Sequence, residues 1–201
     1  MAKGQRRRSG KVERRIAEAL GVLEALGLPR GQINERSALT LLALLNLRPD
    51  TPWSEAGNPL CGVTPIMEFA AQHYKREYAP NTRETFRHYT IHQFRQAGLV
   101  TANPDTPKRA TNSPRYVYQI ADDALELLRT FGSEAWDHQL RSYLTSVDTL
   151  RERYARERDM QLIPVKVTPG KVVNLSPGGH NTLVQTIIND FAPRFTPGGT
   201  L

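Results

Sequence analysis

The chain has 201 residues, a formal net charge of +7, 39% hydrophobic residues and 23% charged residues. These values fit one domain, or one domain and part of another, and they argue against wholesale disorder. The longest apolar run, residues 39–45, is far too short to cross a bilayer, and no signal-peptide hydrophobic stretch follows the basic N-terminus. We therefore expect a cytoplasmic protein without a membrane partner. The single Cys61 excludes an internal disulfide framework.

The positive charge is concentrated in two segments. Residues 1–15 hold seven basic groups and one acidic group, a net +6. Residues 74–118 hold eight basic and three acidic groups, a net +5, which leaves the remaining residues at −4. Two basic segments on a mildly acidic protein point to an anionic partner such as nucleic acid, although a merely solubilising charge would give a similar total.

The first elements are predicted to be helices. Residues 1–10 form a basic segment that we expect to be a flexible arm, and a helix should follow from about Lys11 to Leu26 because its apolar residues recur at helical spacing. Asn34 is placed to cap a second helix that runs to about Asn46. This second helix is apolar on most sides and should lie at the centre of the core.

Two more helices are predicted after a loop rich in Pro and Gly at residues 47–63. Thr64 and Pro65 form a typical helix start, and that helix should run to about Tyr78. The next helix should begin at residues 80–82 and end at Ala97, with Gly98 as its C-terminal stop.

The following residues predict a β-hairpin with a long basic tip. Residues 99–103 and 115–120 are expected to be strands, and residues 104–114 the loop between them. Asp122 should cap a short helix to about Phe131, before a long helix over 133–159. Beyond Met160 we expect strands at 162–167 and 171–175 and a helix at 180–191.

A pair of helices joined by a turn and followed by a hairpin is typical of a winged helix-turn-helix. The predicted fold is therefore mostly α with a small β-hairpin wing. On the helix before the hairpin, the expected core side holds Phe86, Tyr89, Thr90, Gln93 and Ala97. The opposite side holds Glu84, His88, His92 and Arg95, flanked by Arg83 and Arg87.

This arrangement predicts two sets of contacts with double-stranded DNA. Contacts to bases or within the groove are expected from Arg83, Arg87, His88 and Arg95. Contacts to phosphate are expected from Asn81, Thr82, Lys108, Arg109 and Arg115. The plain alternative is a small helical domain with a solvated basic helix.

Several segments also resemble a known family. They are residues 78–87 (Tyr-Ala-Pro-Asn-Thr-Arg-Glu-Thr-Phe-Arg), 90–94, 97–100, 103–105, 112–114 and 118–120, with a second block at 175–181, 187–188 and 191–195. This pattern is similar to the N-terminal region of the BsuBI/PstI family of type II restriction endonucleases. The resemblance implies a winged-helix DNA-binding domain followed by a magnesium-dependent nuclease domain of the PD-(D/E)XK type, which cuts a short palindromic duplex site in a restriction-modification system.

The chain departs from that family at the nuclease motif, which needs a carboxylate two residues before a lysine to help hold Mg²⁺. None of the six lysines has an acidic residue at that position. We therefore expect residues 11–160 to form the DNA-binding domain and residues 161–201 to be a linker and the truncated start of the nuclease domain. The chain alone is expected to hold no catalytic residue, metal ligand or cofactor and to be inactive, whereas Mg²⁺ would be needed by the full-length family enzyme.

The long predicted helix carries a heptad pattern. Trp136, Leu140, Tyr143, Val147, Leu150 and Tyr154 recur at alternating spacings of four and three. The seam could pair two copies of the chain, which would suit a palindromic site, or a homodimer could form through the nuclease domain. We favour packing of this helix against the chain's own first helices, because two or three heptads are short for an independent coiled coil.

Other functions remain open from the sequence. The same fold could serve a free-standing transcriptional regulator, or the heptad helix could make the chain a non-DNA interaction module. His88 and His92 have the spacing of metal ligands on a helix, but no clear partner accompanies them. Cys61 is more simply an inert thiol than a nucleophile.

Overall fold

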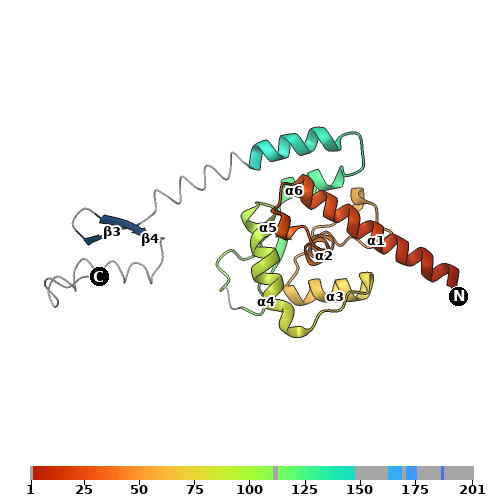
Figure 1. Cartoon of the computed structure of the whole chain (residues 1–201), viewed down its shortest axis with the longest axis horizontal. Helices are drawn as coiled ribbons and strands as arrows, with labels where there is room; N and C mark the ends of the chain where they lie inside the picture. The colour runs from red at the N-terminus through yellow and green to blue at the C-terminus, as the bar shows by residue number, and fades with distance from the viewer. Residues whose placement is uncertain (1, 111–112, 148–162, 169–170, 176–186, 188–201) are drawn as a thin grey trace. The chain divides into compact units, whose positions relative to one another are not determined.

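A computed structural model describes residues 2–110, 113–147, 163–168, 171–175 and 187 (Figure 1). The chain divides into two compact units, Met1–Val147 and Asp148–Leu201. The first unit ends at Val147, which is buried in its core. The domain boundary expected at residue 160 lies outside the described residues.

The core of the first unit is built around α2 (Glu35–Leu44). Every residue of α2 from Ser37 to Leu44 is buried, as the apolar pattern predicted. The helix is capped as expected, because the Asn34 side chain accepts a hydrogen bond from the Ser37 backbone N–H at 3.0 Å.

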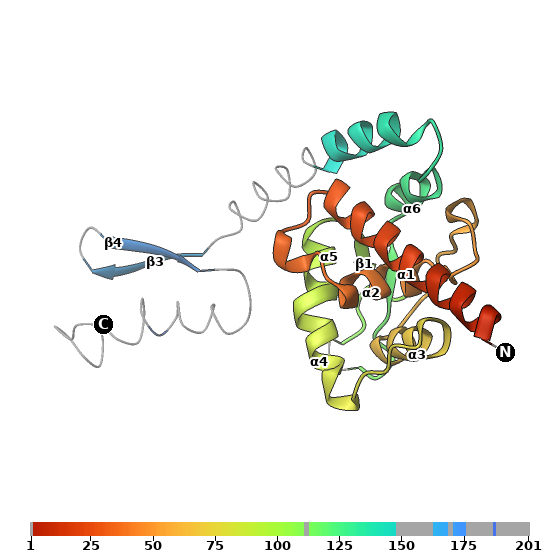
Figure 2. The ribbon, with the colours of Figure 1, turned by 45° about the vertical axis from the view of Figure 1, so that its right-hand side comes forward.

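Helix α1 (Ala2–Ala25) packs across α2, as Figures 1 and 2 both show, and η1 (Arg30–Gln32) lies in the connection between them. The helix begins at Ala2, so residues 2–10 are its first turns and not the separate arm that was predicted. These residues include no proline, and Ala, Lys, Gln and Arg among them are good helix formers, so their sequence is compatible with a helix.

Helix α3 (Val63–Tyr74) is displaced slightly from its prediction. Its N-cap is Gly62 and not Thr64, and it stops at Tyr74 because Lys75 adopts a left-handed conformation with φ 59°. The buried Tyr74 hydroxyl donates a hydrogen bond to the Leu47 carbonyl, which ties the end of α3 to the end of α2.

Residues 80–96 form one rod made of four consecutive helical pieces (Figure 2). They are η3 (Pro80–Thr82), α4 (Arg83–Phe86), the π-helical turn η4 (Arg87–Ile91) and α5 (His92–Gln96). Gly98 has a φ of +75° and ends the rod, as predicted.

A small antiparallel sheet follows the rod. Strand β1 (Val100–Ala102) pairs with β2 (Tyr118–Ile120), with Val100 opposite Ile120. Cys61 adds an antiparallel bridge on the other side of Tyr118, with N–O distances of 2.9 and 2.8 Å. The segment that leads into α3 is thereby tied to the hairpin.

The first unit closes with α6 (Asp122–Arg129) and a helix over residues 136–147. Ala121 is the N-cap of α6, so Asp122 is its first residue and not its cap. Phe131 contacts Trp136 and also Trp53 of η2 (Trp53–Glu55), with ring centroids 5.0 and 4.8 Å apart. These rings anchor the start of the last helix.

The helix over 136–147 uses its heptad side within the chain. Tyr143 and Val147 are buried, and Trp136 and Leu140 pack against the same core. These four positions therefore pack on the core of the first unit, which agrees with packing inside the chain, and Trp136 and Leu140 stay partly exposed. Leu150 and Tyr154 lie outside the described residues.

Of the second unit, the structure describes one hairpin. Strand β3 (Ile163–Thr168) pairs antiparallel with β4 (Lys171–Leu175), close to the two predicted strands. The helix predicted over 180–191 falls almost wholly outside the described residues.

The described structure is therefore mostly helical with small antiparallel sheets, as predicted. Within it, no helix is long and apolar enough to span a membrane.

Candidate nucleic-acid interface

The rod over residues 80–96 presents a polar face, and its π turn changes which residues are buried behind that face. The wider i→i+5 turn rotates the residues that follow Arg87, so Thr90 and Ile91 are both buried. Tyr89, which α-helical spacing placed on the core side, is 65% exposed and lies at the surface instead. The predicted polar side is confirmed, because its members Glu84, His88, His92 and Arg95 are all exposed.

Contacts from the preceding helices orient the rod. The Arg36 Nε of α2 donates a hydrogen bond of 2.9 Å to the Oγ1 of Thr90, whose side chain is fully buried. Just before the rod, Arg76 pairs with Glu13 of α1 at 2.8 Å and with Glu35 of α2 at 3.0 Å. The hydrogen bonds to Glu35 and Glu13 raise the pKa of Arg76 above its ordinary value. The rod is therefore held by charged and polar contacts as well as by its apolar side.

Three predicted DNA contacts lie near the start of the rod. Asn81 and Arg83 are exposed and Thr82 is half-buried. The Arg83 guanidinium donates a long hydrogen bond of 3.4 Å to Thr64 Oγ1, so it lies beside the first turn of α3. Arg95 is exposed at the other end of the rod. The two arginines are thus separated along its length.

Arg87 differs from these residues because it faces the hairpin. Its guanidinium lies 5.7 Å from the centre of the Tyr116 ring, and a hydrogen bond with Tyr118 raises its pKa. Its Nη1 also lies 3.8 Å from Oε1 of Glu84. The second carboxylate oxygen of Glu84, Oε2, is 3.1 Å from His88 Nε2. Arg87 therefore links the rod to the hairpin, whereas His88 stays on the exposed face.

The loop between β1 and β2, residues 103–117, is called the wing loop below; the structure describes residues 103–110 and 113–117 of it. Asn103 starts it in a left-handed conformation with φ 46° and is almost fully buried. Its backbone N–H donates to the Val117 carbonyl at 2.9 Å, and its side-chain Oδ1 accepts from the Val117 N–H at 3.0 Å. One residue therefore closes the base of the wing loop.

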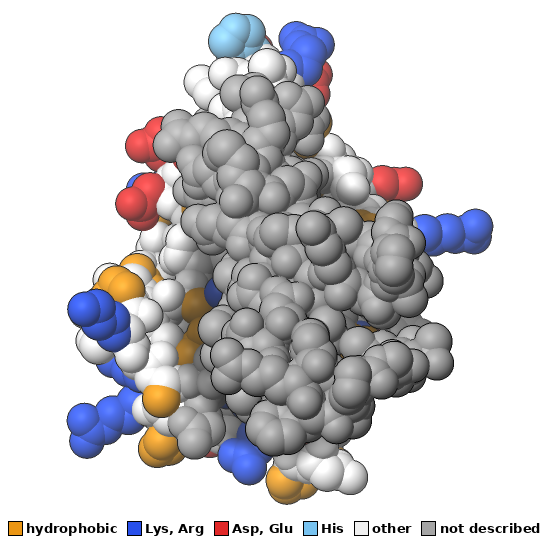
Figure 3. Space-filling model, turned by 90° about the vertical axis from the view of Figure 1, so that its left-hand side faces the viewer, with side chains coloured by type: hydrophobic (Ala, Val, Ile, Leu, Met, Phe, Trp, Pro, Cys, Tyr) orange, Lys and Arg blue, Asp and Glu red, His pale blue; other side chains and the backbone are white. Residues whose placement is uncertain are grey.

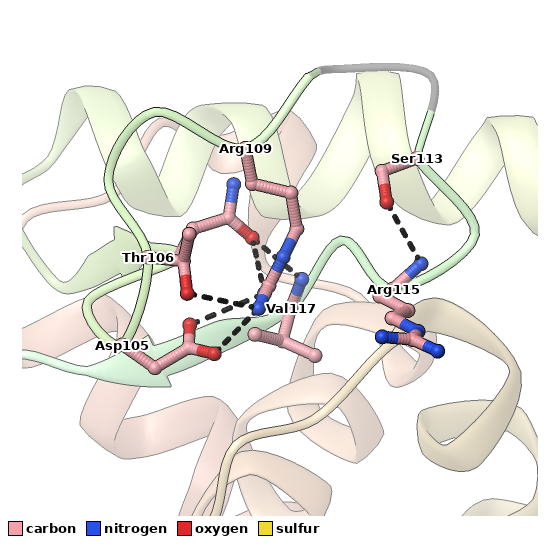
Figure 4. Close-up of polar contacts among 7 residues, drawn as sticks. Asp105, Thr106, Arg109, Ser113, Arg115 and Val117 are labelled. Atoms are coloured by element: carbon pink, nitrogen blue, oxygen red, sulfur yellow. Dashed lines mark hydrogen bonds and ion pairs between the residues drawn. The ribbon is translucent and has the colours of Figure 1, made fainter.

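Arg109 is turned inward within the wing loop (Figure 4). It forms a two-point ion pair with Asp105, at 2.6 and 3.2 Å, and also donates to Asn103 Oδ1 and Thr106 Oγ1. The ion pair holds the pKa of Asp105 below its usual range. Only 16% of the Arg109 side chain is exposed, so it is poorly placed for the phosphate contact that the sequence suggested.

Lys108 and Arg115 remain exposed on the wing loop, as a phosphate contact requires. In Figure 4 the Arg115 side chain points away from the Asp105–Arg109 pair, while its backbone N–H donates to Ser113 Oγ at 3.2 Å. Figure 3 shows Lys and Arg side chains protruding at several places around one face, and those at its lower left lie beside exposed hydrophobic groups.

The sequence assigned no contact to the residues that organise this surface, namely Arg36, Asn103, Asp105 and Tyr116, although 103–105 is among the segments that resemble the family. Their partners lie far away along the chain, as with Arg36 and Thr90. An Asn just after a strand is a weak turn signal that could have indicated Asn103. Nothing in the sequence distinguishes Arg109, which is paired, from its exposed neighbour Lys108.

Among the residues that the structure describes, no three His, Cys, Asp or Glu side chains come together as metal ligands would. His88 pairs with Glu84.

Comparisons with known proteins identify the family. A sequence profile of the BsuBI/PstI restriction endonuclease HTH domain matches residues 13–152. The type II restriction enzyme BsuBI of Bacillus subtilis is 52% identical over 186 residues, which cover 92% of this chain and 59% of that enzyme. The type II restriction enzyme AplI of Arthrospira platensis is 34% identical over 184 residues, which cover 92% of this chain and 56% of the enzyme.

A solved structure agrees with the sequence comparisons. The SdaI restriction endonuclease matches with a TM-score of 0.62 and 35% identity, over 90% of this chain and 57% of the SdaI chain. This chain therefore spans less than two thirds of the length of these relatives. It belongs to the BsuBI/PstI restriction endonuclease family, and residues 13–152 correspond to the family's HTH domain.

Proposed function

We propose that the first unit binds double-stranded DNA as a winged helix-turn-helix, as part of a type II restriction enzyme. In this arrangement α3 and the rod over 80–96 are the two helices of the motif, and the wing loop is the wing. The rod would enter the major groove with its exposed face, while Lys108 and Arg115 would meet the phosphate backbone.

The observation that carries this proposal is the pairing of the exposed face with the wing loop. The face is made of exposed polar side chains, and Arg87 holds it next to the hairpin through Tyr116 and Tyr118. Exposed arginines lie at both ends of the rod, at Arg83 and Arg95. A duplex can therefore contact the rod and the wing loop together.

A salt titration tests the proposal. Each Lys or Arg that neutralises a phosphate contributes about −0.9 to the slope of log K against log salt. Arg83→Gln and Arg115→Gln should each weaken binding to a labelled duplex and make this slope less steep by about that amount. Arg141→Gln is the matched control, because Arg141 is exposed on the helix over 136–147. A wild-type affinity that does not change with salt would contradict DNA binding.

We further propose that cleavage by the family's enzymes requires residues that this chain does not supply. The support is the absence of an acidic residue two positions before any of the six lysines. A homodimer on a palindromic site would then have to use surfaces other than the buried positions of the helix over 136–147.

A further inference from the structure

We infer that Arg109 is a positioning residue that, together with Asp105 and Asn103, fixes the shape of the wing loop before DNA is bound. This inference rests on the proposed function, because it concerns how the wing reaches its ligand. It reassigns Arg109 from a phosphate contact to an internal brace of the loop.

The hydrogen-bonding capacity of Arg109 supports the inference. Its Nη1 donates to Asn103 Oδ1 and Asp105 Oδ1, both at 3.2 Å. Its Nη2 donates to Asp105 Oδ2 at 2.6 Å and to Thr106 Oγ1 at 3.3 Å. These four contacts use all four N–H bonds of the two terminal nitrogens. A phosphate could reach these nitrogens only by displacing a partner that is already in place.

The brace connects the tip of the loop to its base. Asn103 Oδ1 accepts both from Arg109 and from the backbone N–H of Val117, across the neck of the loop (Figure 4). Two backbone hydrogen bonds, from Thr106 to Asn103 and from Arg109 to Thr106, each 3.0 Å long, complete the turn between them. The first half of the wing loop is thus a closed structure with a charged pair inside it.

The contacts of Arg109 also explain which side chains of the loop are exposed to solvent. Arg109 is 16% exposed and Asp105 34% exposed, whereas Lys108 is fully on the surface. Because these contacts hold the first half of the loop, presenting Lys108 to a duplex costs less conformational entropy than it would from a flexible segment.

The two roles predict opposite effects for Asp105→Asn. If Arg109 contacts phosphate, this substitution removes a negative charge and releases Arg109, so DNA should bind more tightly. If Arg109 is a brace, the loop loses its two-point pair, and affinity should fall by about threefold or more despite the more favourable net charge. Glu126→Gln on α6 is the charge-matched control, since Glu126 is exposed outside the wing loop.

The substitution Arg109→Lys provides a second, independent test of the brace. Lysine keeps the positive charge but cannot form the two-point pair. A brace predicts that Arg109→Lys weakens binding to about the same extent as Asp105→Asn, and that the double variant is no weaker than either single one. A phosphate contact predicts that Arg109→Lys binds almost as tightly as the wild type.

The measurement is the fluorescence anisotropy of a labelled random-sequence duplex, titrated with the full chain at two salt concentrations. Weaker binding by both Asp105→Asn and Arg109→Lys, with Glu126→Gln at or above wild-type affinity, supports the brace. Tighter binding by Asp105→Asn, or unchanged binding by Arg109→Lys, overturns it. A wild-type chain that binds no DNA would instead overturn the proposed function itself.

Discussion

The arginines of this domain fall into two groups that their positions in the sequence do not reveal. Arg15, counted in the basic N-terminal segment, is buried, donates to the Thr51 carbonyl and lies 5.5 Å from the centre of the Trp53 ring. Arg36 and Arg109 are likewise occupied by partners within the protein. The charge available to a ligand is therefore smaller than the net charge of the two basic segments, and it is concentrated on exposed residues such as Arg83 and Arg115.

Among single residues, Tyr116 should contribute to DNA affinity although it carries no charge. Its ring supports the Arg87 guanidinium, and a partly exposed contact of this kind is worth about 0.5–1 kcal/mol. Tyr116→Ala should weaken binding by roughly two- to fivefold, while Tyr116→Phe, which keeps the ring, should bind like the wild type. Anisotropy titrations of both variants measure this, and equal losses from the two would contradict a role for the ring face.

His73 gives the fold a dependence on pH. Partial burial first, and then the nearby Arg48 and Lys75, lower the pKa of His73 below 6.5. The unfolded chain therefore binds this proton at a higher pH than the folded chain does. The contribution of His73 to stability is fully present above about pH 7 and is lost as the pH falls through the lowered pKa.

Urea unfolding at pH 7.5, 6.5 and 5.5 tests the role of His73. The free energy of unfolding of the wild type should decrease more steeply between pH 7.5 and 5.5 than that of His73→Gln. Parallel curves for the two proteins would show that His73 does not contribute to the pH dependence.

At the scale of elements, the order and type of the secondary structure followed from the sequence, but several boundaries did not. Asn34 and Gly98 were correctly placed as a cap and a stop, because the local chemistry of each decides its role. The start of α1 and the end of α3 were misplaced. Lys75 ends α3 in a left-handed conformation that lysine rarely adopts, so no local signal marked it.

The π turn was also missed because no local signal in the sequence marks it. Nothing in residues 87–91 by themselves requires i→i+5 bonds, and the turn allows Thr90 to reach Arg36 while Ile91 is buried. Helical periodicity assumes one uniform pitch, so it placed Tyr89 on the wrong side. The exposed side of the rod was therefore largely predictable from the sequence, whereas the pairing of Arg109 with Asp105 inside the wing loop was not.

Two glycines make a matched test of helix geometry. Gly98 has a φ of +75°, where a side chain is strained, whereas Gly21 is exposed in the middle of α1 with open space around it. Gly98→Ala should lower the free energy of unfolding by about 1–2 kcal/mol. Gly21→Ala should raise it by about 0.5–1 kcal/mol. Thermal or urea unfolding measures both, and a stabilising Gly98→Ala would contradict the left-handed stop.

At the scale of the whole molecule, the chain matches its relatives over less than two thirds of their length, and the matched family domain lies within its first 152 residues. We expect this chain to bind DNA without cutting it. Incubation with supercoiled plasmid and Mg²⁺ should leave the plasmid uncut, while a gel shift of the same DNA should show binding. Linearisation at a defined site would contradict this expectation and would place a nuclease site in the present sequence.

The π turn also has a consequence for engineering this helix. It acts as a one-residue insertion in the helix that we propose reads the groove, and the wider turn absorbs the extra residue, so the residues after it face as they would in a regular helix one residue shorter. Deleting one residue from 88–91 should therefore restore α-helical bonding and leave the downstream half facing nearly the same way. His92 and Gln96 would then stay on the side shared with Glu84 and His88. The length of this helix can thus change by one residue while the side chains after the turn keep their direction.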